Sequence, residues 1–350
     1  MSERWLIACL LCSVWGVGNT SAVLFTSKGA MTGDWSVPGT WTNEAVPGDG
    51  DDVAIVGASS EVILSGNSSN LQSLTVSGKL MFTNWNSILT ATNVAILSGG
   101  VVKLPAAFTN NGVSNNIHIL CTNLAIAAGG SINADFGGYA GLSQSVGGGP
   151  GGGSGYQGGG GHGGRGGGGG GGLPYGSSNA PVVPGSAGGA HPSPGYPGGS
   201  GGGAVRSHAS GAMVMSGTIT ANGATTGPAS SSGGGSGGSI YITCSTLAGT
   251  GGVVRACGGD GPYANGGGGR VAVVYETNAQ SILPVPSIVF QTTPGRGSSG
   301  HEGDVGTLYF PDNRFLTQPV QHTGQWWVPT TTNWTVNDLL LRNGWIRFPA

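Results

Sequence analysis

The sequence predicts an all-β chain whose short strands stack coil upon coil into parallel sheets, forming a solenoid. Apolar and polar residues alternate over short segments such as 270–275, which is typical of strands with one buried face. A strand–turn–strand motif recurs at intervals of 20 to 30 residues, and such periods indicate a solenoid. Val205 precedes Ile219 by 14 residues, and Ile240 precedes Val254 by the same 14. This regularity predicts that successive coils place their strands in register.

The composition excludes several classes of partner and fold. Charged residues make up only 7% of the 350 residues and the net charge is -2, so neither nucleic acid nor an anionic membrane surface is an expected partner. Glycine accounts for 74 residues, yet no Gly-X-Y period with dense proline is present, which excludes a collagen-like chain. The long apolar side chains are few but strongly patterned, which favours many short strands over helices.

Residues 1–22 have the features of a secretion signal. Arg4 supplies a positive charge, an apolar run follows, and Thr20, Ser21 and Ala22 form a small-residue cleavage site. The apolar run is too short to span a bilayer. We therefore predict no transmembrane segment and a secreted or cell-surface location.

Cleavage at this site would leave Cys121, Cys244 and Cys257. Cys121 and Cys244 hold equivalent places in coils that are separated by one further coil. Stacked strands lie about 4.8 Å apart, so these two backbones lie about 10 Å apart, whereas a disulfide needs Cα atoms within about 7 Å. We expect both residues to be small, buried and apolar in character.

Residues 23–52 are predicted to form an N-terminal cap. Trp35, Trp41 and several turn residues precede the first repeat strand, which suits a segment that covers the open end of a stack of coils. The acidic cluster within 49–52 contains the residue type that binds calcium. Because no ligand-rich loop continues the cluster, we interpret it as a solvated turn.

Residues 53–316 are predicted to form the body of the solenoid. Alternation buries one face of every strand, and equivalent strands of successive coils pair into a parallel sheet around a narrow apolar core. A β-sandwich is the competing fold, but it does not require a turn motif to recur at equivalent positions. The predicted inward pairs of the first three repeats are Leu74 and Val76, Val94 and Ile96, and Leu124 and Ile126.

A glycine-rich excursion interrupts the solenoid between residues 137 and 203. Within 147–172, 20 of the 26 residues are glycine. One interpretation is a disordered linker, because glycine loses the most entropy on ordering. The other interpretation uses position, because two shorter glycine loops, 223–238 and 258–269, leave the coils at the same corner. Side by side, the three loops could hydrogen-bond as extended threefold helices.

Residues 317–350 have the features expected at the start of another set of repeats. Trp326, Trp327 and Trp334 precede a strand–turn–strand pattern over 338–348. We expect this segment to begin a further β-repeat, either truncated here or continued in a longer protein.

The run from Gly233 to Tyr275 contains Gly-Gly-Ser-Gly-Gly-Ser-Ile-Tyr-Ile and Gly-Gly-Gly-Gly-Arg-Val-Ala-Val-Val-Tyr. It resembles exported bacterial right-handed parallel β-helix proteins that bear glycine-rich loops, and the Pro-Gly-Asp-Gly-Asp-Asp of 47–52 is similar to the start of many such surface modules. The resemblance covers most of 31–310. It implies a right-handed, pectate-lyase-like β-helix, export, and attachment to a surface or matrix. In composition, the glycine tract also resembles the glycine-rich domain of the anaplastic lymphoma kinase receptor.

Because β-helices also host pectate lyases and polygalacturonases, we searched the sequence for catalytic sets. His162 between two glycines matches a short polygalacturonase motif, but it lies in the glycine tract without accompanying carboxylates, and sugar hydrolysis needs two carboxylates flanking the bond. Glu276, Glu302 and Asp304 are scattered. We predict no catalytic residue, no metal site and no cofactor.

The outward faces of the strands carry the candidate binding residues. Alternation turns Val205 and Ile240 inward and the next residue of each strand outward, so outward residues of successive coils form columns on a flat sheet. Aromatic and polar groups on such a face could stack on and hydrogen-bond a glycan. The alternative is that these positions are merely solvated, or covered by the glycine loops. The candidates are His118, Arg206, His208 and Tyr241 in these columns, and Arg255, which points outward from the second strand of its coil.

The sequence therefore predicts a structural or adhesive module of an exported cell-surface or matrix protein, without catalysis. The expected partners are extracellular glycans or components of the cell envelope. The alternative is a polysaccharide-active enzyme, a lyase or glycoside hydrolase, on the same fold. Turnover of a polyanionic glycan would separate the two hypotheses.

Overall fold

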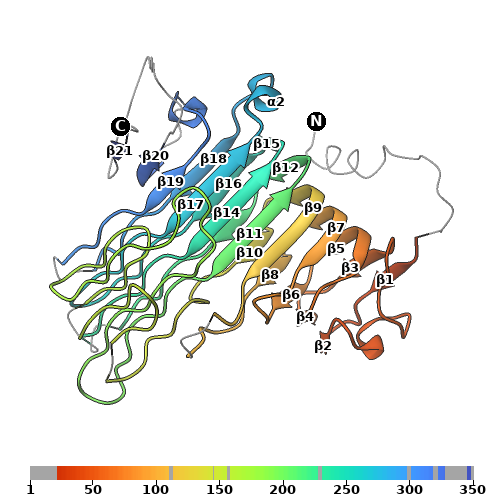
Figure 1. Cartoon of the computed structure of the whole chain (residues 1–350). Coiled ribbons are helices and arrows are strands. Elements are labelled where there is room, and N and C mark those ends of the chain that lie inside the picture. Colours follow the sequence, from red (N-terminus) through yellow and green to blue (C-terminus); the bar gives the residue numbers. More distant parts are fainter. Residues whose placement is uncertain are drawn as a thin grey trace.

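The computed structural model describes residues 22–109, 113–144, 146–155, 158–227, 231–297, 301–317, 322–327 and 345–347. Nearly all the regular structure is β, and the named strands pair in parallel. Successive strands alternate between two sheets, so the chain coils about one axis as a right-handed parallel β-helix (Figure 1). The predicted fold class is confirmed.

Sheet 1 runs the length of the described chain. In order of pairing it consists of β1 (Leu24–Thr26), β3 (Asp52–Ile55), β5 (Asn70–Val76), β7 (Leu89–Ile96), β9 (Ile117–Ile126), β11 (Ala204–Ala209), β14 (Ser239–Cys244), β17 (Arg270–Tyr275), β19 (Thr307–Tyr309), β20 (Gln325–Trp327) and β21 (Trp345–Arg347), with the branch β12 (Ala212–Met215) and β15 (Thr246–Ala248). Both β11 and β12 pair with β9, because the long strands of the early coils divide into two shorter strands in the later ones.

Sheet 2 faces sheet 1 across the core. It consists of β2 (Thr32–Asp34), β4 (Glu61–Leu64), β6 (Lys79–Phe82), β8 (Val101–Lys103), β10 (Ser131–Asn133), β13 (Thr218–Thr220), β16 (Thr250–Arg255) and β18 (Ser287–Gln291). The described helices are short: η1 (Pro38–Thr40), α2 (Thr277–Ser281) and η2 (Arg314–Thr317). In the described part of the chain, no helix combines the length and hydropathy needed to cross a membrane.

The core is built from the inward residues of both sheets. Each predicted inward residue of the first repeats is at most 2% exposed, and equivalent residues lie opposite one another, as Leu74, Val94 and Leu124 do. In the later coils, Val205 and Ile240 are fully buried and in register. Burial of apolar surface contributes about 25 cal/mol per Å², so this continuous column supplies the main stabilisation of the coils.

Two tryptophans occupy the N-terminal end of the core. Trp35 and Trp41 are buried, with ring centroids 5.0 Å apart, and the indole N–H of Trp41 donates to the carbonyl oxygen of Trp35. The segment also supplies β1 and β2, the first strands of the two sheets. The domain boundaries predicted at residues 22, 52 and 316 stay predictions. Residues 1–21 of the expected signal, and most of 317–350, lie outside the described residues.

Glycines close the turns between the two sheets. Gly99 and Gly129 occupy equivalent turns and both have φ of +82°, a conformation that residues with a Cβ rarely adopt. The N–H of Gly99 donates to the carbonyl oxygen of Gly129, so the two turns stack. The recurring glycine turn therefore fixes the register in which one coil sits on the next.

The glycine loops form one hydrogen-bonded layer, which Figure 1 shows as extended threads beside the sheets. In segment 233–238, backbone N–H groups three residues apart donate to the same neighbouring segment. A threefold extended helix repeats its orientation every third residue and has no internal hydrogen bonds. The interpretation of the loops as side-by-side threefold helices is confirmed. The donors Gly233 and Ser236 pair with residues 189 and 186, Gly234 and Gly237 with 264 and 267, and Gly235 and Gly238 with 224 and 221.

Close packing explains why this layer is made of glycine. A Cβ on Gly234 would lie 2.1 Å from the carbonyl oxygen of Gly259, and one on Gly163 would lie 1.9 Å from that of Gly269. Such distances leave no room for a side chain without moving a neighbouring backbone. The excursion is part of the same layer, since Gly160 donates to Gly234 and Gly163 donates to Gly268. The described part of the tract is therefore packed, not a linker.

A proline-containing strap, residues 173–184, returns from the glycine layer across the outer side of sheet 1. Its carbonyl oxygens accept hydrogen bonds from side chains on three successive strands. Val182 accepts from Arg206 of β11, Val183 from Ser239 of β14, and Tyr175 from Arg270 of β17. The strap therefore covers the starts of these strands, while outward residues further along them, such as Tyr241 and Thr243, are half-buried.

The three described cysteines are free thiols. Cys121 lies opposite Ala209 of the next coil, which separates it from Cys244 as expected. Cys244 is buried, whereas Cys121 is half-buried. Burial raises the pKa of both thiols to about 12, so neither ionises at neutral pH.

Candidate functional site

A column of outward side chains crosses sheet 1 from β9 to β20. Strand register places one residue of each strand opposite the next, and neighbouring strands lie about 4.8 Å apart. Ala272 of β17 interrupts the column of larger side chains. We call the larger residues, together with their neighbour His208, the outer track. The outer track consists of His118, Arg206, His208, Tyr241, Tyr309 and Trp327.

The track follows from strand alternation. In β14, Ile240 and Ile242 are buried while Tyr241 between them is half-buried, and β9 and β11 show the same alternation. Tyr309 follows the fully buried Leu308, which turns it outward beside the earlier column. Four of the five residues predicted to bind therefore meet on one face, and alternation could also have identified Tyr309.

Aromatic rings contact one another along the track. The rings of His118 and His208 lie 5.5 Å apart edge to face, and His208 and Tyr241 are separated by the same distance in the same arrangement. The Nδ1 atom of His208 lies 2.7 Å from the hydroxyl of Thr243 on the adjacent strand. These contacts fix the rings as a platform with alternating orientations.

Arg206 carries the positive charge at this end of the track. Its guanidinium lies 5.2 Å from the ring centre of Trp85, a cation–π contact, and it donates to Val182 of the strap at 3.4 Å. Asn116 holds the Trp85 turn by donating to its carbonyl oxygen at 2.6 Å. The sequence did not point to Trp85, because it lies in a turn outside the alternating pattern.

Two polar atoms beside this contact have no hydrogen-bond partner among the described residues. They are Nε2 of His118 and Nε of Arg206, which lie on residues that face each other across β9 and β11. Burial lowers the pKa of His118 to about 4, and the charges of Arg206 and His208 act in the same direction. Burial and the charge of Arg206 also lower the pKa of His208. At neutral pH the histidines are therefore neutral and the guanidinium supplies the charge.

Arg255 does not join this group. It is exposed at the end of β16 in sheet 2, between Thr220 and Gln291 of the neighbouring strands. Its outward direction was foreseen, but the sheet to which it belongs separates it from the outer track.

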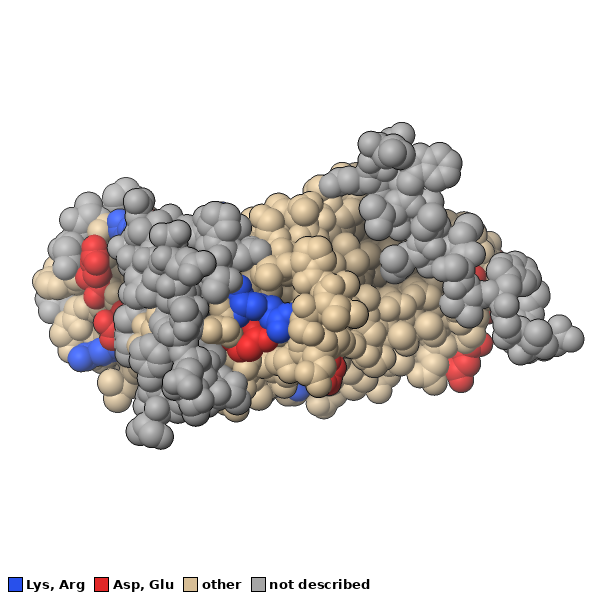
Figure 2. Space-filling view, turned by 90° about the horizontal axis from the view of Figure 1, so that it is seen from above, with Lys and Arg blue, Asp and Glu red and all other residues tan. Residues whose placement is uncertain are grey.

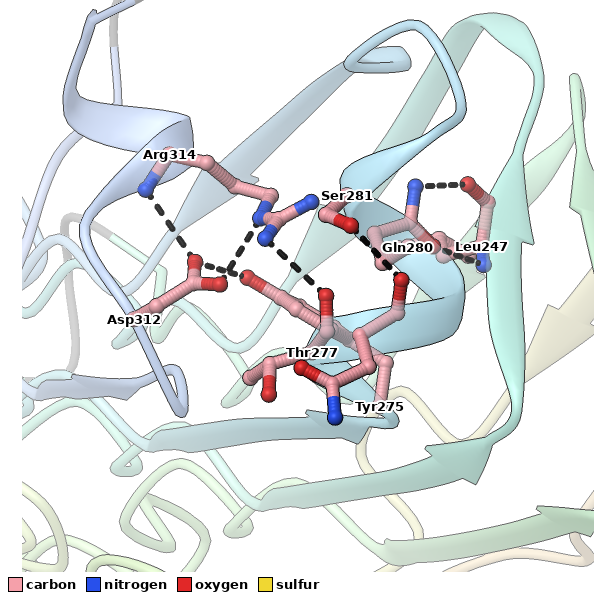
Figure 3. A network of polar contacts seen from close by, with 8 residues as sticks. Leu247, Tyr275, Thr277, Gln280, Ser281, Asp312 and Arg314 are labelled. Carbon is pink, nitrogen blue, oxygen red and sulfur yellow. Dashed lines mark hydrogen bonds and ion pairs between the residues drawn. The ribbon is translucent and has the colours of Figure 1, made fainter.

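A network of charged and polar side chains connects β17, α2 and η2 (Figure 3). Asp312 accepts hydrogen bonds from the Tyr275 hydroxyl at 2.5 Å and from Nε of Arg314 at 2.8 Å. Arg314 also donates to the carbonyl oxygen of Thr277 in α2. Burial and the bond to Asp312 raise the pKa of Tyr275. The network attaches α2 and η2 to the sheet, and both carboxylate oxygens of Asp312 accept hydrogen bonds within it.

The remaining charges are sparse. Figure 2 shows one face on which uncharged residues predominate, with a small group of both signs near its centre. Among the described residues, no group of three or more His, Cys, Asp or Glu side chains could hold a metal ion. In the acidic cluster, Asp49 accepts from the N–H of Asn70 at 2.8 Å and Asp51 from that of Gly48 at 2.8 Å. These carboxylates therefore stabilise the turn.

Residues 40–131 match the family model of the G8 domain. The match begins within η1 and ends at the first residue of β10, so the first coils of the β-helix contain a G8 domain. Within the outer track, only His118 falls inside the match, and the glycine layer lies wholly beyond it. Comparison with curated proteins and with solved structures finds no match.

Proposed function

We propose that this chain is a structural or adhesive module of an exported cell-surface or matrix protein, and that its outer track binds an extracellular glycan. The observation that supports this most directly is the register of the track, which lines up rings and a guanidinium along a stacked sheet. Sugar rings present apolar C–H faces that stack on aromatic side chains, and their hydroxyls hydrogen-bond polar groups beside the rings.

The rigidity of the scaffold supports the same proposal. Every track residue lies directly opposite a residue of a neighbouring strand, so the spacing of the rings is set by the backbone. A rigid array loses little conformational entropy when it binds an extended chain.

Export is part of the proposal. It is supported by the signal-like composition of residues 1–22 and by the low charge of the chain. The alternative function, a polysaccharide-active enzyme on the same fold, requires turnover in addition to binding.

Affinity electrophoresis of the full chain in gels containing neutral or acidic polysaccharides tests the proposal. We expect retardation by at least one glycan, and weaker retardation for Tyr241→Ala and Tyr309→Ala by about two- to tenfold in affinity, the range for loss of one stacking contact. Tyr263→Ala, a tyrosine of the glycine layer, is the matched control and should bind normally. Arg255→Ala should also bind normally.

Three results would contradict the proposal. Absence of retardation across the panel would remove glycan binding, and equal loss in the Tyr263→Ala control would remove the track as its site. Release of shortened or unsaturated products from any of these polysaccharides would favour the enzyme instead.

A further inference from the structure

A cavity of about 750 Å³ lies where the glycine layer meets the starts of β17, β19 and β20. This volume is within the range of small-ligand sites, about 300–1,000 Å³. Its floor is the outer side of sheet 1, the strap residues Pro174, Gly176 and Ser178 line one side, and Trp327 at the end of the outer track forms part of the wall. The lining residues used below are Arg165, Ser178, Arg270, Asp304, Thr307 and Gln325.

Arg270 is the unusual member of the lining. It is only 6% exposed, and its Nε and Nη1 atoms donate to the Tyr175 carbonyl oxygen at 2.8 Å and to the Thr307 hydroxyl at 3.1 Å. Both acceptors are neutral, and within the described residues Arg270 forms no ion pair. Burial lowers its pKa to about 10, so it remains charged at neutral pH. A buried cation without a counter-ion is costly, and an anion in the cavity would offset that cost.

The other charged lining residues define what kind of anion fits. Arg165 is exposed at the rim, and Asp304 is the acidic residue among the lining. Two guanidinium groups and one carboxylate leave a net charge of about +1, which one negative charge neutralises, whereas a multiply charged anion leaves excess negative charge beside Asp304. The backbone N–H groups of Gly163 and Gly164 both donate to Gly268 and do not form a phosphate-binding nest.

We propose that this cavity binds a sugar unit that carries a single carboxylate, a uronic acid. The carboxylate pairs with Arg270 and Arg165, whose planar donors suit its two oxygens. Asp304, Ser178 and Gln325 hydrogen-bond the sugar hydroxyls, and the Trp327 indole packs on the ring. This inference goes beyond the proposed function, since a uronate could bind here whether or not a chain binds along the track.

Titration calorimetry of the full chain with D-glucuronate is the direct test. We expect saturable binding that weakens with added salt, because the interaction is ionic. D-glucose lacks the carboxylate and should bind at least about tenfold more weakly, as expected for loss of a charge-assisted hydrogen bond. Acetate keeps the carboxylate but lacks the ring and its hydroxyls, so it should also bind at least about tenfold more weakly, through loss of the hydrogen bonds and packing of the sugar. Sulfate, the multiply charged comparison, should also bind more weakly than glucuronate.

Variants locate the site. Arg165→Ala removes an exposed side chain, so its fold should be intact, and glucuronate affinity should fall at least about threefold. Arg270→Lys keeps the charge but loses the planar fork and should reduce affinity about tenfold. Asp304→Asn should increase sulfate affinity, because it removes the acidic group of the wall. The matched control is Arg296→Ala, an exposed arginine outside the cavity, which should bind like the parent.

The proposal is overturned if the folded chain shows no binding of glucuronate, or if Arg165→Ala binds it as tightly as Arg296→Ala does. Tighter binding of sulfate than of glucuronate would remove the sugar from the proposal. The comparison of Arg165→Ala with Arg296→Ala decides the test, so the conclusion does not depend on whether the Arg270→Lys variant is stable. Tyr241→Ala, which weakens the outer track, should leave monosaccharide binding unchanged, so the two proposals fail separately.

Discussion

The Nδ1 atom of His162 lies 3.0 Å from the carbonyl oxygen of Gly237, 75 residues further along the chain. Gly234 lies three residues before Gly237, and its carbonyl oxygen accepts a hydrogen bond from the backbone N–H of Gly160. The N–H that would continue the pattern, that of Gly163, donates to Gly268 instead. The imidazole therefore replaces a backbone donor inside the glycine layer, and the histidine that resembled part of a catalytic motif is a fully buried structural residue.

Replacing this histidine should destabilise the layer. His162→Ala leaves a cavity beside Tyr175, whose ring centre lies 4.8 Å away, and removes the donor to Gly237. We expect a loss of about 2–4 kcal/mol in the free energy of unfolding, measured in urea. His301→Ala, at an exposed histidine, is the control. Equal stability of the two variants would contradict this role.

Stability should fall on mild acidification. Burial lowers the pKa of His162 to about 3 and that of His118 to about 4, from an ordinary 6.5. The unfolded chain therefore binds more protons than the folded chain below about pH 6.5, so the free energy of unfolding decreases as the pH falls from there, and its full value is present above.

Unfolding in urea at about pH 7, 6 and 5 measures this slope, which is at most about 1.4 kcal/mol per pH unit for the fully buried His162. His118 contributes less, because solvent screens it. The His162→Gln variant should show a flatter dependence than the parent. A parent slope that His162→Gln leaves unchanged would be inconsistent with the assignment.

Glycines inside and outside the layer should respond differently to alanine. Gly234→Ala places a Cβ 2.1 Å from the Gly259 carbonyl oxygen and should cost about 1–3 kcal/mol or more. Gly169 has no atom within 4 Å of its Cβ position, so Gly169→Ala should change stability by less than about 1 kcal/mol, in the stabilising direction. Thermal unfolding of the two variants provides the comparison.

Gln280 should be essential to the edge of sheet 1. Its side chain accepts from the Leu247 N–H at 2.7 Å and donates to the Leu247 carbonyl oxygen at 2.9 Å, as a neighbouring strand would (Figure 3). Gln280→Ala leaves both buried groups unpaired, at about 1–3 kcal/mol each. Asn278→Ala on the exposed side of α2 is the control, and hydrogen exchange of the Leu247 amide should rise only in the Gln280 variant.

The sequence was sufficient to predict the coils, because the buried faces repeat with a fixed spacing. Val94 and Leu124 could be placed opposite each other from alternation and the glycine turn alone. The same alternation placed Arg206 beside Tyr241. The glycine layer was one of two open interpretations, and hydrogen bonding between loops decided it.

Contacts that turns and loops without a repeat make with the sheets of the β-helix could not be predicted. Trp85 reaches Arg206 from a turn, and the strap crosses three strands without any periodic signal in its sequence. The cavity at Arg270 exists only because residues 163–165 and 303–305 meet β17 and β19 there. Arg255 was predicted to point outward from the second strand of its coil, and that strand, β16, lies in sheet 2.

The threefold pattern of hydrogen bonds in the glycine layer has a consequence for the kinetics of folding. Segment 233–238 needs neighbours that come from as far away as Gly160 and Gly267, so it cannot nucleate locally. The early coils, by contrast, pair with their immediate successors and can propagate one after another. We therefore expect the layer to assemble last, after the coils have brought its threads together, and to set the slowest phase of refolding.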